Sequence, residues 1–354
     1  MSFGAGDAPF LSREVIAGSI EANISDMLDE FPIYNLFCST SSGRPRMLAG
    51  EHAVFDVDYQ EKRKADIHAQ PGLADRFRHT RYGQIAVTML YEQVKDCLRP
   101  NELAQLRMVG LSGQETPTSK DAADKLAKIV TRGTRTILRS REQDCSSMLS
   151  SASYTRTVDG VANTIATGQT LLGSGFVSAN WATASTDIIG DIGKMLETHI
   201  DKAGEDPTDC AISFLTASQI AKNDKVRALL NGAGQLPANS LGYGGVISGV
   251  FAALGVPGVN VVVHKSHYKN ASGTKTYYWS ISRMSLLSLQ MGADVLGYLS
   301  CPVIQEDGSL TTESIDSHSW WSPETEEHSV KIKGRGAPYL GDLDKMTLFD
   351  LTGA

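Results

Sequence analysis

The sequence has no long apolar run, no closely paired cysteines and no secretory leader pattern. No stretch approaches the roughly 18 uninterrupted apolar residues that a membrane-spanning helix requires, and the opening MSFGAGDAPFLSREV lacks the basic and apolar regions of a signal peptide. We therefore expect a soluble protein that is not secreted by that route. The spacing of the cysteines contains no C-x-x-C pair, which indicates reduced, buried thiols rather than a disulfide framework or a zinc site. These cysteines are Cys38, Cys97, Cys145, Cys210 and Cys301.

Short catalytic motifs are also missing. The sequence contains no G-x-S-x-G turn, and GYGGVISG at 242–249 matches neither a dinucleotide-binding fingerprint nor a phosphate-binding loop. His264 and His267 in HKSH have no acidic or cysteine residue close by in the sequence, so we predict no metal site. We likewise predict no catalytic and no cofactor-binding residues. Because a catalytic triad can be assembled from distant residues, an α+β enzyme with its site near the glycine-rich residues 231–256 stays open as an alternative.

The chain does contain enough apolar material for a large core, and its net charge is acidic. It has 354 residues, of which 41% are hydrophobic, enough for two globular domains or for one domain with extensions. Its formal net charge is −7. This charge argues against a dedicated nucleic-acid binder, because affinity for a duplex comes mainly from neutralised phosphates.

One long helix is predicted from Thr118 to Ser150. Pro117 blocks continuation backwards, Thr118 with Asp121 resembles a capping box, and apolar residues recur at helical spacing, interrupted by Gly133. At 1.5 Å per residue this helix would be about 50 Å long, whereas a compact globule of this chain length has a radius of gyration of about 20 Å. An elongated subunit is therefore favoured. The basic residues of the helix lie mostly away from the apolar stripe, facing either solvent or an acidic partner: Lys125, Lys128, Arg132, Arg135 and Arg139.

Residues 43–84 are dense in charges of both signs and predict an extended β-hairpin. Apolar residues alternate in AVFDVDYQ and in RYGQIAVT, the pattern of strands with one apolar face, and Pro71 and Gly72 punctuate the polar tip between them. Asp56 and Asp58 fit a solvated strand face better than a metal-binding pair. An isolated two-stranded ribbon is marginally stable in water, so this arm needs a surface to lie on.

The remaining segments alternate between helices and strands. Spacing predicts a helix over residues 11–28, which packs on its own domain or on a neighbouring subunit, and another helix with Ser185 or Thr186 as its N-cap. A buried strand at 211–215 leads into a helix with Ser218 near its start, and the C-terminal tail alternates as two further strands. This mixed order indicates an α+β fold.

In this order the segments resemble the major capsid proteins of tailed double-stranded DNA phages, which have the Hong Kong 97-type fold, and most closely the lambda-like major head proteins. The resemblance covers most of the chain. Its most specific parts are DCAISFLTASQIAKNDKVRALLN, similar to a strand and helix of the axial domain, and RGAPYLGDLDKMTLFDL, similar to the closing strand of the peripheral domain. The resemblance implies this division: an N-terminal arm at 1–42, an extended loop at 43–84, a peripheral domain at 85–205 with its spine helix at about 118–150, an axial domain at 206–300, and a return to the peripheral domain at 301–354.

The resemblance implies a structural subunit and not an enzyme. Copies would assemble into hexamers and pentamers of an icosahedral phage head in the host bacterial cytoplasm, around packaged double-stranded DNA that is not bound sequence-specifically. Only a short segment precedes the charged arm, so a separate scaffolding protein is implied, with a portal and a decoration protein as further partners. A cargo-holding nanocompartment of the same fold is a second alternative. Charged residues of the extended loop and the spine helix are the predicted intersubunit contacts: Asp56, Asp58, Glu61, Lys62, Lys64, Arg132, Arg135 and Arg139.

Overall fold

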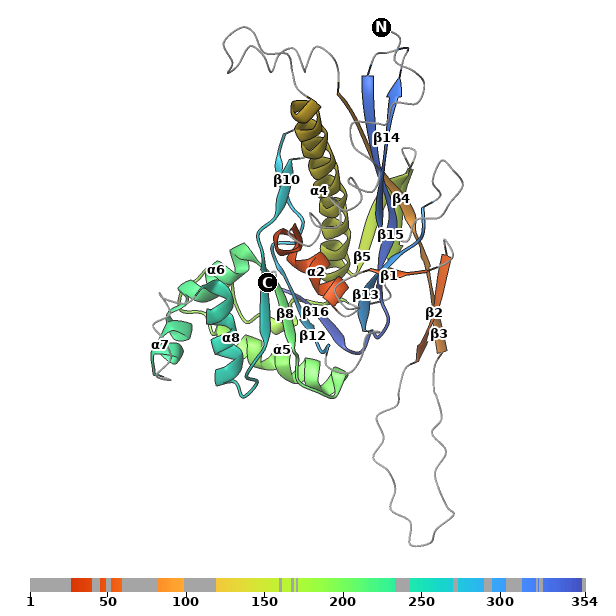
Figure 1. The fold of residues 1–354 in the computed structure, drawn as a ribbon. Helices are drawn as coiled ribbons and strands as arrows, with labels where there is room; N and C mark the ends of the chain where they lie inside the picture. Colours follow the sequence, from red (N-terminus) through yellow and green to blue (C-terminus); the bar gives the residue numbers. More distant parts are fainter. Residues whose placement is uncertain are drawn as a thin grey trace, which may run out of the picture.

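The chain folds into an upright part and a lateral part, and the sheets of both parts pack against one long helix (Figure 1). The computed structural model describes residues 27–39, 45–48, 52–58, 82–98, 119–158, 161–166, 169, 171–232, 242–269, 273–289, 295–303, 314–322, 324 and 327–351. Within this part of the chain, every helix is either too short or too polar to cross a membrane. The mixture of helices and sheets confirms the predicted α+β class.

This helix is α4 (Ser119–Ser151), which confirms the long helix predicted from the sequence. Its apolar stripe is buried as the spacing requires, through Leu126, Val130, Ile137, Leu138, Met148 and Leu149. Gly133 has a role that the sequence did not indicate. A Cβ atom at this position would lie 2.2 Å from Cδ1 of Ile332, so an alanine here would require the Ile332 side chain or the helix to shift.

The first sheet lies against α4 and forms the upright part. Its longest strand, β15, pairs antiparallel with three others, β4, β13 and β14, and β13 pairs in parallel with the short β1. The bounds are β1 (Arg46–Met47), β4 (Leu90–Leu98), β13 (Leu296–Ser300), β14 (Ile315–Ser322) and β15 (Glu327–Leu340). The C-terminal pair of strands predicted from alternation is therefore confirmed, although its second strand, β16 (Met346–Asp350), belongs to a different sheet.

The second sheet has the order β7-β16-β12-β8-β9 and carries helices α5 to α8. Its strands are β7 (Leu171–Leu172), β8 (Asp209–Ser213), β9 (Asn260–His264), β12 (Arg283–Leu287) and β16. The helices are the short 3-10 turn η2 (Ser174–Phe176) and α5 (Ile188–Ala203), α6 (Phe214–Lys222), α7 (Asp224–Gly232) and α8 (Tyr243–Ala253). Their apolar faces form a core of their own, which includes Ile192, Ile212, Val226, Phe251 and Phe349.

Two helix starts differ from those predicted. Helix α5 begins after Asp187, whose side chain makes no capping hydrogen bond, so neither Ser185 nor Thr186 is its N-cap. The cap of α6 is Ser213, whose hydroxyl oxygen accepts a hydrogen bond from the backbone N–H of Thr216 at 3.1 Å. The sequence offered several hydroxyl residues near each start, and local spacing alone could not choose among them.

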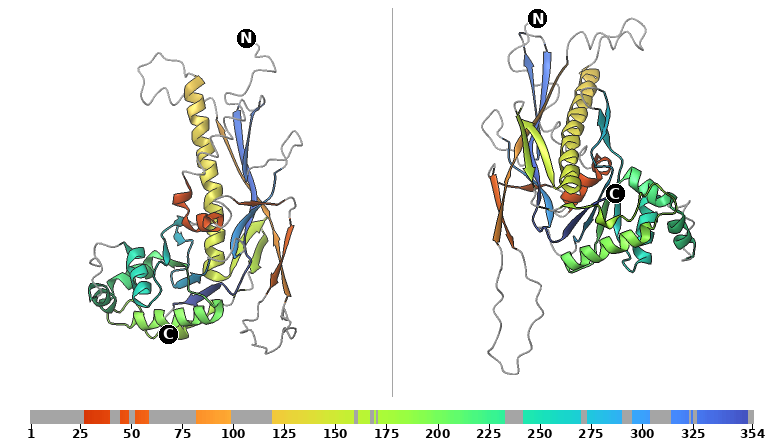
Figure 2. Two further views of the ribbon diagram at one scale, coloured as in Figure 1. Left: turned by 60° about the horizontal axis from the view of Figure 1, so that its bottom comes forward. Right: turned by 180° about the vertical axis from the view of Figure 1, so that it is seen from behind.

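Three two-stranded hairpins complete the strands, and Figure 2 shows them from two further sides. Their bounds are β2 (His52–Asp58) with β3 (Tyr82–Thr88), β5 (Ser153–Val158) with β6 (Val161–Ala166), and β10 (His267–Lys269) with β11 (Lys275–Tyr277). The β2–β3 pairing, from His52 opposite Thr88 to Asp58 opposite Tyr82, is the hairpin predicted for residues 43–84. The predicted tip between these strands lies outside the described residues.

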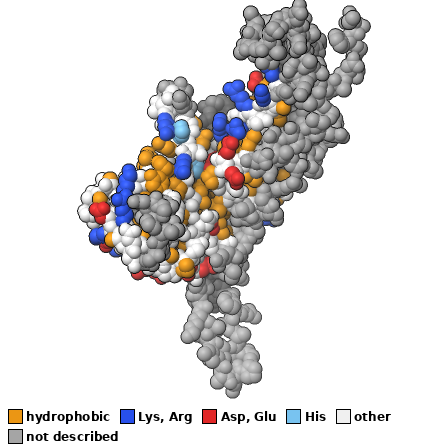
Figure 3. Space-filling model, turned by 60° about the vertical axis from the view of Figure 1, so that its left-hand side comes forward, with side chains coloured by type: hydrophobic (Ala, Val, Ile, Leu, Met, Phe, Trp, Pro, Cys, Tyr) orange, Lys and Arg blue, Asp and Glu red, His pale blue; other side chains and the backbone are white. Residues whose placement is uncertain are grey.

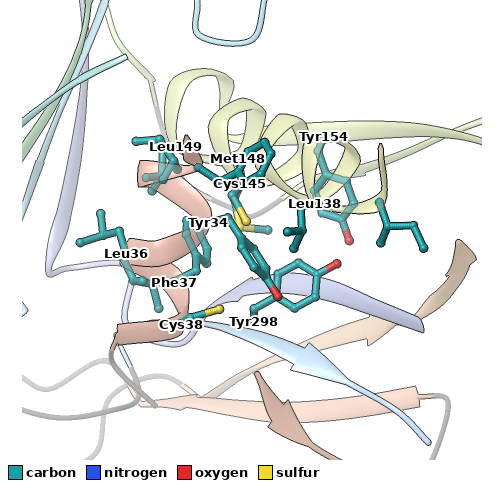
Figure 4. Close-up of a cluster of buried hydrophobic side chains, with 14 of the residues drawn as sticks. Tyr34, Leu36, Phe37, Cys38, Leu138, Cys145, Met148, Leu149, Tyr154 and Tyr298 are labelled. Atoms are coloured by element: carbon teal, nitrogen blue, oxygen red, sulfur yellow. The ribbon is translucent and has the colours of Figure 1, made fainter. Parts of the chain in front are cut away.

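The segment before the hairpin packs in the main core. The short turn η1 (Leu28–Glu30) and helix α2 (Pro32–Ser39) lie against α4, β13 and β9, and Phe31, Ile33 and Phe37 are almost fully buried. Figure 4 shows the side chains of α2 and α4 meeting there, with Tyr34 beside Tyr298 of β13. Residues 27–39 are therefore part of the body, although the sequence placed them in an arm at 1–42. The helix predicted over 11–28 falls almost wholly outside the described residues.

The two cores divide the chain differently from the boundaries expected at 205 and 300. Helix α5 packs with α7 and β16 in the second core, although the sequence placed it in the peripheral domain at 85–205. Strand β13 joins the first sheet, although it lies within 206–300. Which core an element joins depends on sheet partners that are far apart in the sequence. Composition and local spacing therefore could not locate the boundaries between the two parts.

Candidate functional site

His264 and His267 lie in different environments. His264 is buried at the end of β9, whereas His267 is exposed at the start of β10. Among the described residues no group of three or more histidine, cysteine, aspartate or glutamate side chains is placed to hold a metal ion. The cysteines carry free thiols, and all but the half-buried Cys97 are buried. Burial raises the pKa of the Cys38 thiol to about 11, which makes it unreactive near neutral pH.

A buried carboxylate, Glu142 of α4, joins three elements. Its oxygens accept hydrogen bonds from the backbone N–H groups of Ile33 at 3.3 Å and Tyr34 at 2.6 Å, which are the first free donors of α2. Nε2 of His264 lies 2.8 Å from Oε1 of the same carboxylate, and both side chains are fully buried. An anion at a helix N-terminus satisfies donors that the helix itself leaves unpaired. Glu142 thus holds α2 on α4 and fastens β9 to the same point.

A second buried cluster joins α4 to the first sheet and to β5. Glu92 of β4 accepts from Nε of Arg141 at 2.8 Å and from the guanidinium of Arg156 at 3.0 Å. Nε of Arg156 also donates to Asp144 at 2.6 Å. Arg141 donates further to the hydroxyl of Tyr34 at 3.0 Å, so the cluster reaches α2 as well.

Burial shifts the protonation of this cluster. It raises the pKa of Asp144 to about 6, against the opposing effect of the Arg156 guanidinium. It raises the pKa of Tyr34 well above its ordinary value, partly offset by Arg141, and the two remain hydrogen-bonded. Such charges are costly to bury unless they are paired, and removing one partner leaves the other uncompensated. The cluster therefore specifies how α2, α4, β4 and β5 fit together.

The sequence analysis missed both clusters, although α4 contains a signal for them. The apolar stripe of the helix passes through Arg141, Glu142 and Cys145, so charged residues occupy core-facing positions there. A charge inside an apolar stripe predicts a buried partner. The partners themselves lie 49 residues away for Glu92 and 122 for His264, beyond what local spacing can indicate.

The predicted interface arginines of α4 are on the surface, and one of them is paired within the chain. Arg132 and Arg139 are exposed. Arg135 donates to Glu30 of η1 at 3.0 Å, and about a third of its side chain is exposed. Figure 3 shows Lys and Arg side chains gathered along this face of the molecule.

Among the described residues, the strand that carries the predicted partners Asp56 and Asp58 does not lie beside these arginines. Asp56 and Asp58 lie on β2, whose backbone alone is described, and β2 lies on the far side of the first sheet from α4 (Figure 1). Glu61, Lys62 and Lys64 fall outside the described residues. Among the described residues, Arg132 and Arg139 face solvent.

Comparison with known proteins gives a fold without a sequence family. No family model and no curated protein sequence matches the chain. Its structure is similar to that of the "putative capsid protein of prophage" of E. coli CFT073, with a TM-score of 0.62 and 12% identity over 97% of this chain and 99% of that one. It is also similar to a phage-related protein of Bordetella bronchiseptica RB50, with a TM-score of 0.54 and 12% identity over 96% and 98% of the two chains.

These similarities extend over nearly the whole length of both partners, so they concern the complete arrangement of α4, the two sheets and the lateral helices. At 12% identity they establish the fold alone. This chain has the α+β fold of the E. coli prophage protein, which confirms the capsid-type fold expected from the order of its segments.

Proposed function

We propose that this chain is a structural subunit that assembles into hexamers and pentamers of an icosahedral phage head enclosing double-stranded DNA. The observation that carries the proposal is the fold, which this chain shares over nearly its whole length with the prophage capsid protein. The role is that of a building element and not of a catalyst. The shell would be the capsid of a virion assembled in a bacterial cytoplasm.

The form of the subunit supports this proposal. Helix α4 extends along the upright part, and the β2–β3 hairpin pairs with no other strand among the described residues (Figure 1). Val87 at the base of β3 is buried against the first sheet of its own chain. A two-stranded ribbon gains little stability alone, so further apolar contacts along the hairpin would come from a neighbouring copy. The buried clusters around Glu142 and Glu92 hold the body rigid while such contacts form.

Contacts between copies are proposed for the extended loop and α4. Arg132 and Arg139 would face acidic residues of a neighbour's loop, and Arg135 would join them only by leaving Glu30. Exposed ion pairs add little affinity each, but opposite charges on facing surfaces select the partner and its orientation. The loop residues concerned are Asp56, Asp58, Glu61, Lys62 and Lys64.

Other partners follow from the same role. Scaffolding and portal proteins would guide assembly, a decoration protein would bind the finished shell, and the DNA inside would be held without sequence-specific contacts. The net charge of −7 suits a wall that faces DNA, because a strongly basic lining would immobilise the phosphates.

Electron microscopy of the purified chain tests the proposal. We expect closed particles with icosahedral symmetry, or hexamers and pentamers that close after a scaffolding protein is added. A compact monomer under all these conditions would contradict it. If particles purified from cells enclose an enzyme but no DNA, the protein is a nanocompartment shell instead. A small oligomer that binds a metabolite would indicate an enzyme.

A further inference from the structure

One end of the molecule carries a basic surface with an apolar centre, which we name the α6–β10 surface. Leu215 of α6 and Ile281 are 38% and 48% exposed, unusual for large apolar residues. The hydroxyl of Ser213 holds the carbonyl of Ile281 at 2.8 Å, so the two apolar side chains sit on a fixed backbone. The surface comprises Phe214, Leu215, Tyr243, Lys265, Lys275 and Ile281.

The charges of this surface are all of one sign. Between Asp224 and Asp294 the sequence contains no aspartate and no glutamate. Nζ of Lys265 lies 5.7 Å from the ring centre of Phe214, and Nζ of Lys275 lies 4.8 Å from that of Tyr277. On the face that Figure 3 shows, hydrophobic side chains gather in the middle, with Lys, Arg and His side chains around them and fewer Asp and Glu side chains, most of them toward the edges. Such a surface fits an acidic partner.

The same chain carries an acidic surface elsewhere, which we name the α5 end surface. It comprises Glu197, Asp201, Glu205, Asp206, Asp342 and Asp344, from the C-terminal half of α5 and the turn between β15 and β16. Nζ of Lys345 joins the two segments through the carbonyl of Ala203 at 3.1 Å and the carboxylate of Glu205 at 2.8 Å. Lys194 is the exposed cation nearest in sequence to Glu197 on the helix.

The two surfaces lie on different sides of one chain. Helix α5 runs along the lower side of the lateral part in Figure 1, α6 lies on the upper side of the same part, and the β10–β11 hairpin, which carries Lys275, lies higher still beside α4. Opposite charges on different sides of one subunit favour head-to-tail contact between identical copies. A contact of this heterologous kind generates a ring when its rotation closes.

We propose that, in the assembled protein, the α5 end surface of one copy lies against the α6–β10 surface of the next copy. This inference rests on the proposed function and names the surfaces through which neighbours in a ring recognise one another. The apolar centre of Leu215 and Ile281 supplies burial, and the surrounding charges fix the orientation. The contact is separate from the one proposed between the extended loop and α4.

Charge reversal on each surface tests the contact. One variant combines Lys265→Glu with Lys275→Glu, and the other combines Glu197→Lys with Asp206→Lys. Like charges then face each other, so each variant alone should yield about tenfold fewer assembled particles than the unmodified chain, or still fewer. A mixture of the two variants should regain six-membered rings, because every contact in an alternating ring of even number again joins opposite charges. A ring of five cannot alternate, so recovery is measured as hexamers and not as closed shells. Controls are Lys95→Glu and Glu324→Lys, which change charge on the first sheet and should assemble normally.

Normal assembly of both reversed variants, or failure of their mixture to form six-membered rings, would overturn the inference. Because a variant can also fail through misfolding, the unmodified chain provides a second measurement. Zero-length carbodiimide crosslinking followed by mass spectrometry should join Lys265 or Lys275 to Glu197 or Asp206 of another copy. Absence of these links among other intermolecular links would reject the contact even if shells form. Presence of the links in a small ring without shells would reject the proposed shell and keep the contact.

Discussion

At the scale of single residues, buried ionisable side chains decide how the body is joined. Glu142 fastens α2 and His264 to α4, and Arg141 and Arg156 share Glu92 between α4 and the first sheet. Pairs of this kind contribute specificity more than stability, because desolvation offsets most of their attraction. Their value here is that each partner comes from a different element, so only one arrangement satisfies them.

Asp144 should make stability depend on pH in a direction opposite to that of most carboxylates. Its pKa is raised from 3.8 to about 6 in the folded chain, so between these values the folded state binds a proton that the unfolded state releases. The contribution of Asp144 to stability should therefore rise as pH falls from 7 to 4. We subtract the free energy of unfolding of the Asp144→Asn variant from that of the unmodified chain, both measured in urea. This difference should increase by about 2 to 3 kcal/mol as pH falls from 7 to 4. Glu324→Gln, at an exposed site, should show a nearly constant difference, and a constant difference for Asp144→Asn would refute the prediction.

At the scale of elements, the approach of α4 to β15 depends on the missing side chain at Gly133. Alanine there would gain about 1 kcal/mol of helix propensity, but its Cβ would meet Cδ1 of the buried Ile332, and overpacking costs about 1 to 3 kcal/mol. We expect Gly133→Ala to lower the free energy of unfolding by about 1 kcal/mol, with most of the loss recovered when Ile332→Val removes that methyl group.

Gly193 in α5 provides the matched control. A Cβ there would have only Leu254 near it, at 4.0 Å, so Gly193→Ala should raise stability by up to about 1 kcal/mol. Thermal or urea unfolding of the unmodified chain, Gly133→Ala, Ile332→Val and the double variant gives a double-mutant cycle for the contact between these two residues. If Gly133→Ala stabilises the chain as Gly193→Ala does, the contact with Ile332 is unimportant.

At the scale of the whole molecule, assembly should protect the extended loop from proteolysis. The β2–β3 hairpin lies apart from α4 and pairs with no further strand among the described residues, so its additional contacts would come from a neighbour (Figure 1). Trypsin should cut the unassembled chain within residues 43–84, where lysines and arginines are frequent, and should cut assembled particles there much more slowly. The fragments are identified by mass spectrometry. Equal cleavage rates in both states would show that the loop gains no contacts on assembly.

The sequence by itself determined what depends on near neighbours along the chain. Apolar spacing located α4 to within a residue, alternation located β2, β3 and the C-terminal strands, and the order of segments indicated the fold. The tertiary structure alone decided that α2 belongs to the core, that α5 and β16 share the second core, and that Gly133 lies directly against Ile332. It also decided which charges are buried together. Periodicity reports which face of an element is apolar, whereas the partner of that face comes from residues often more than a hundred positions away, and only folding brings the two together.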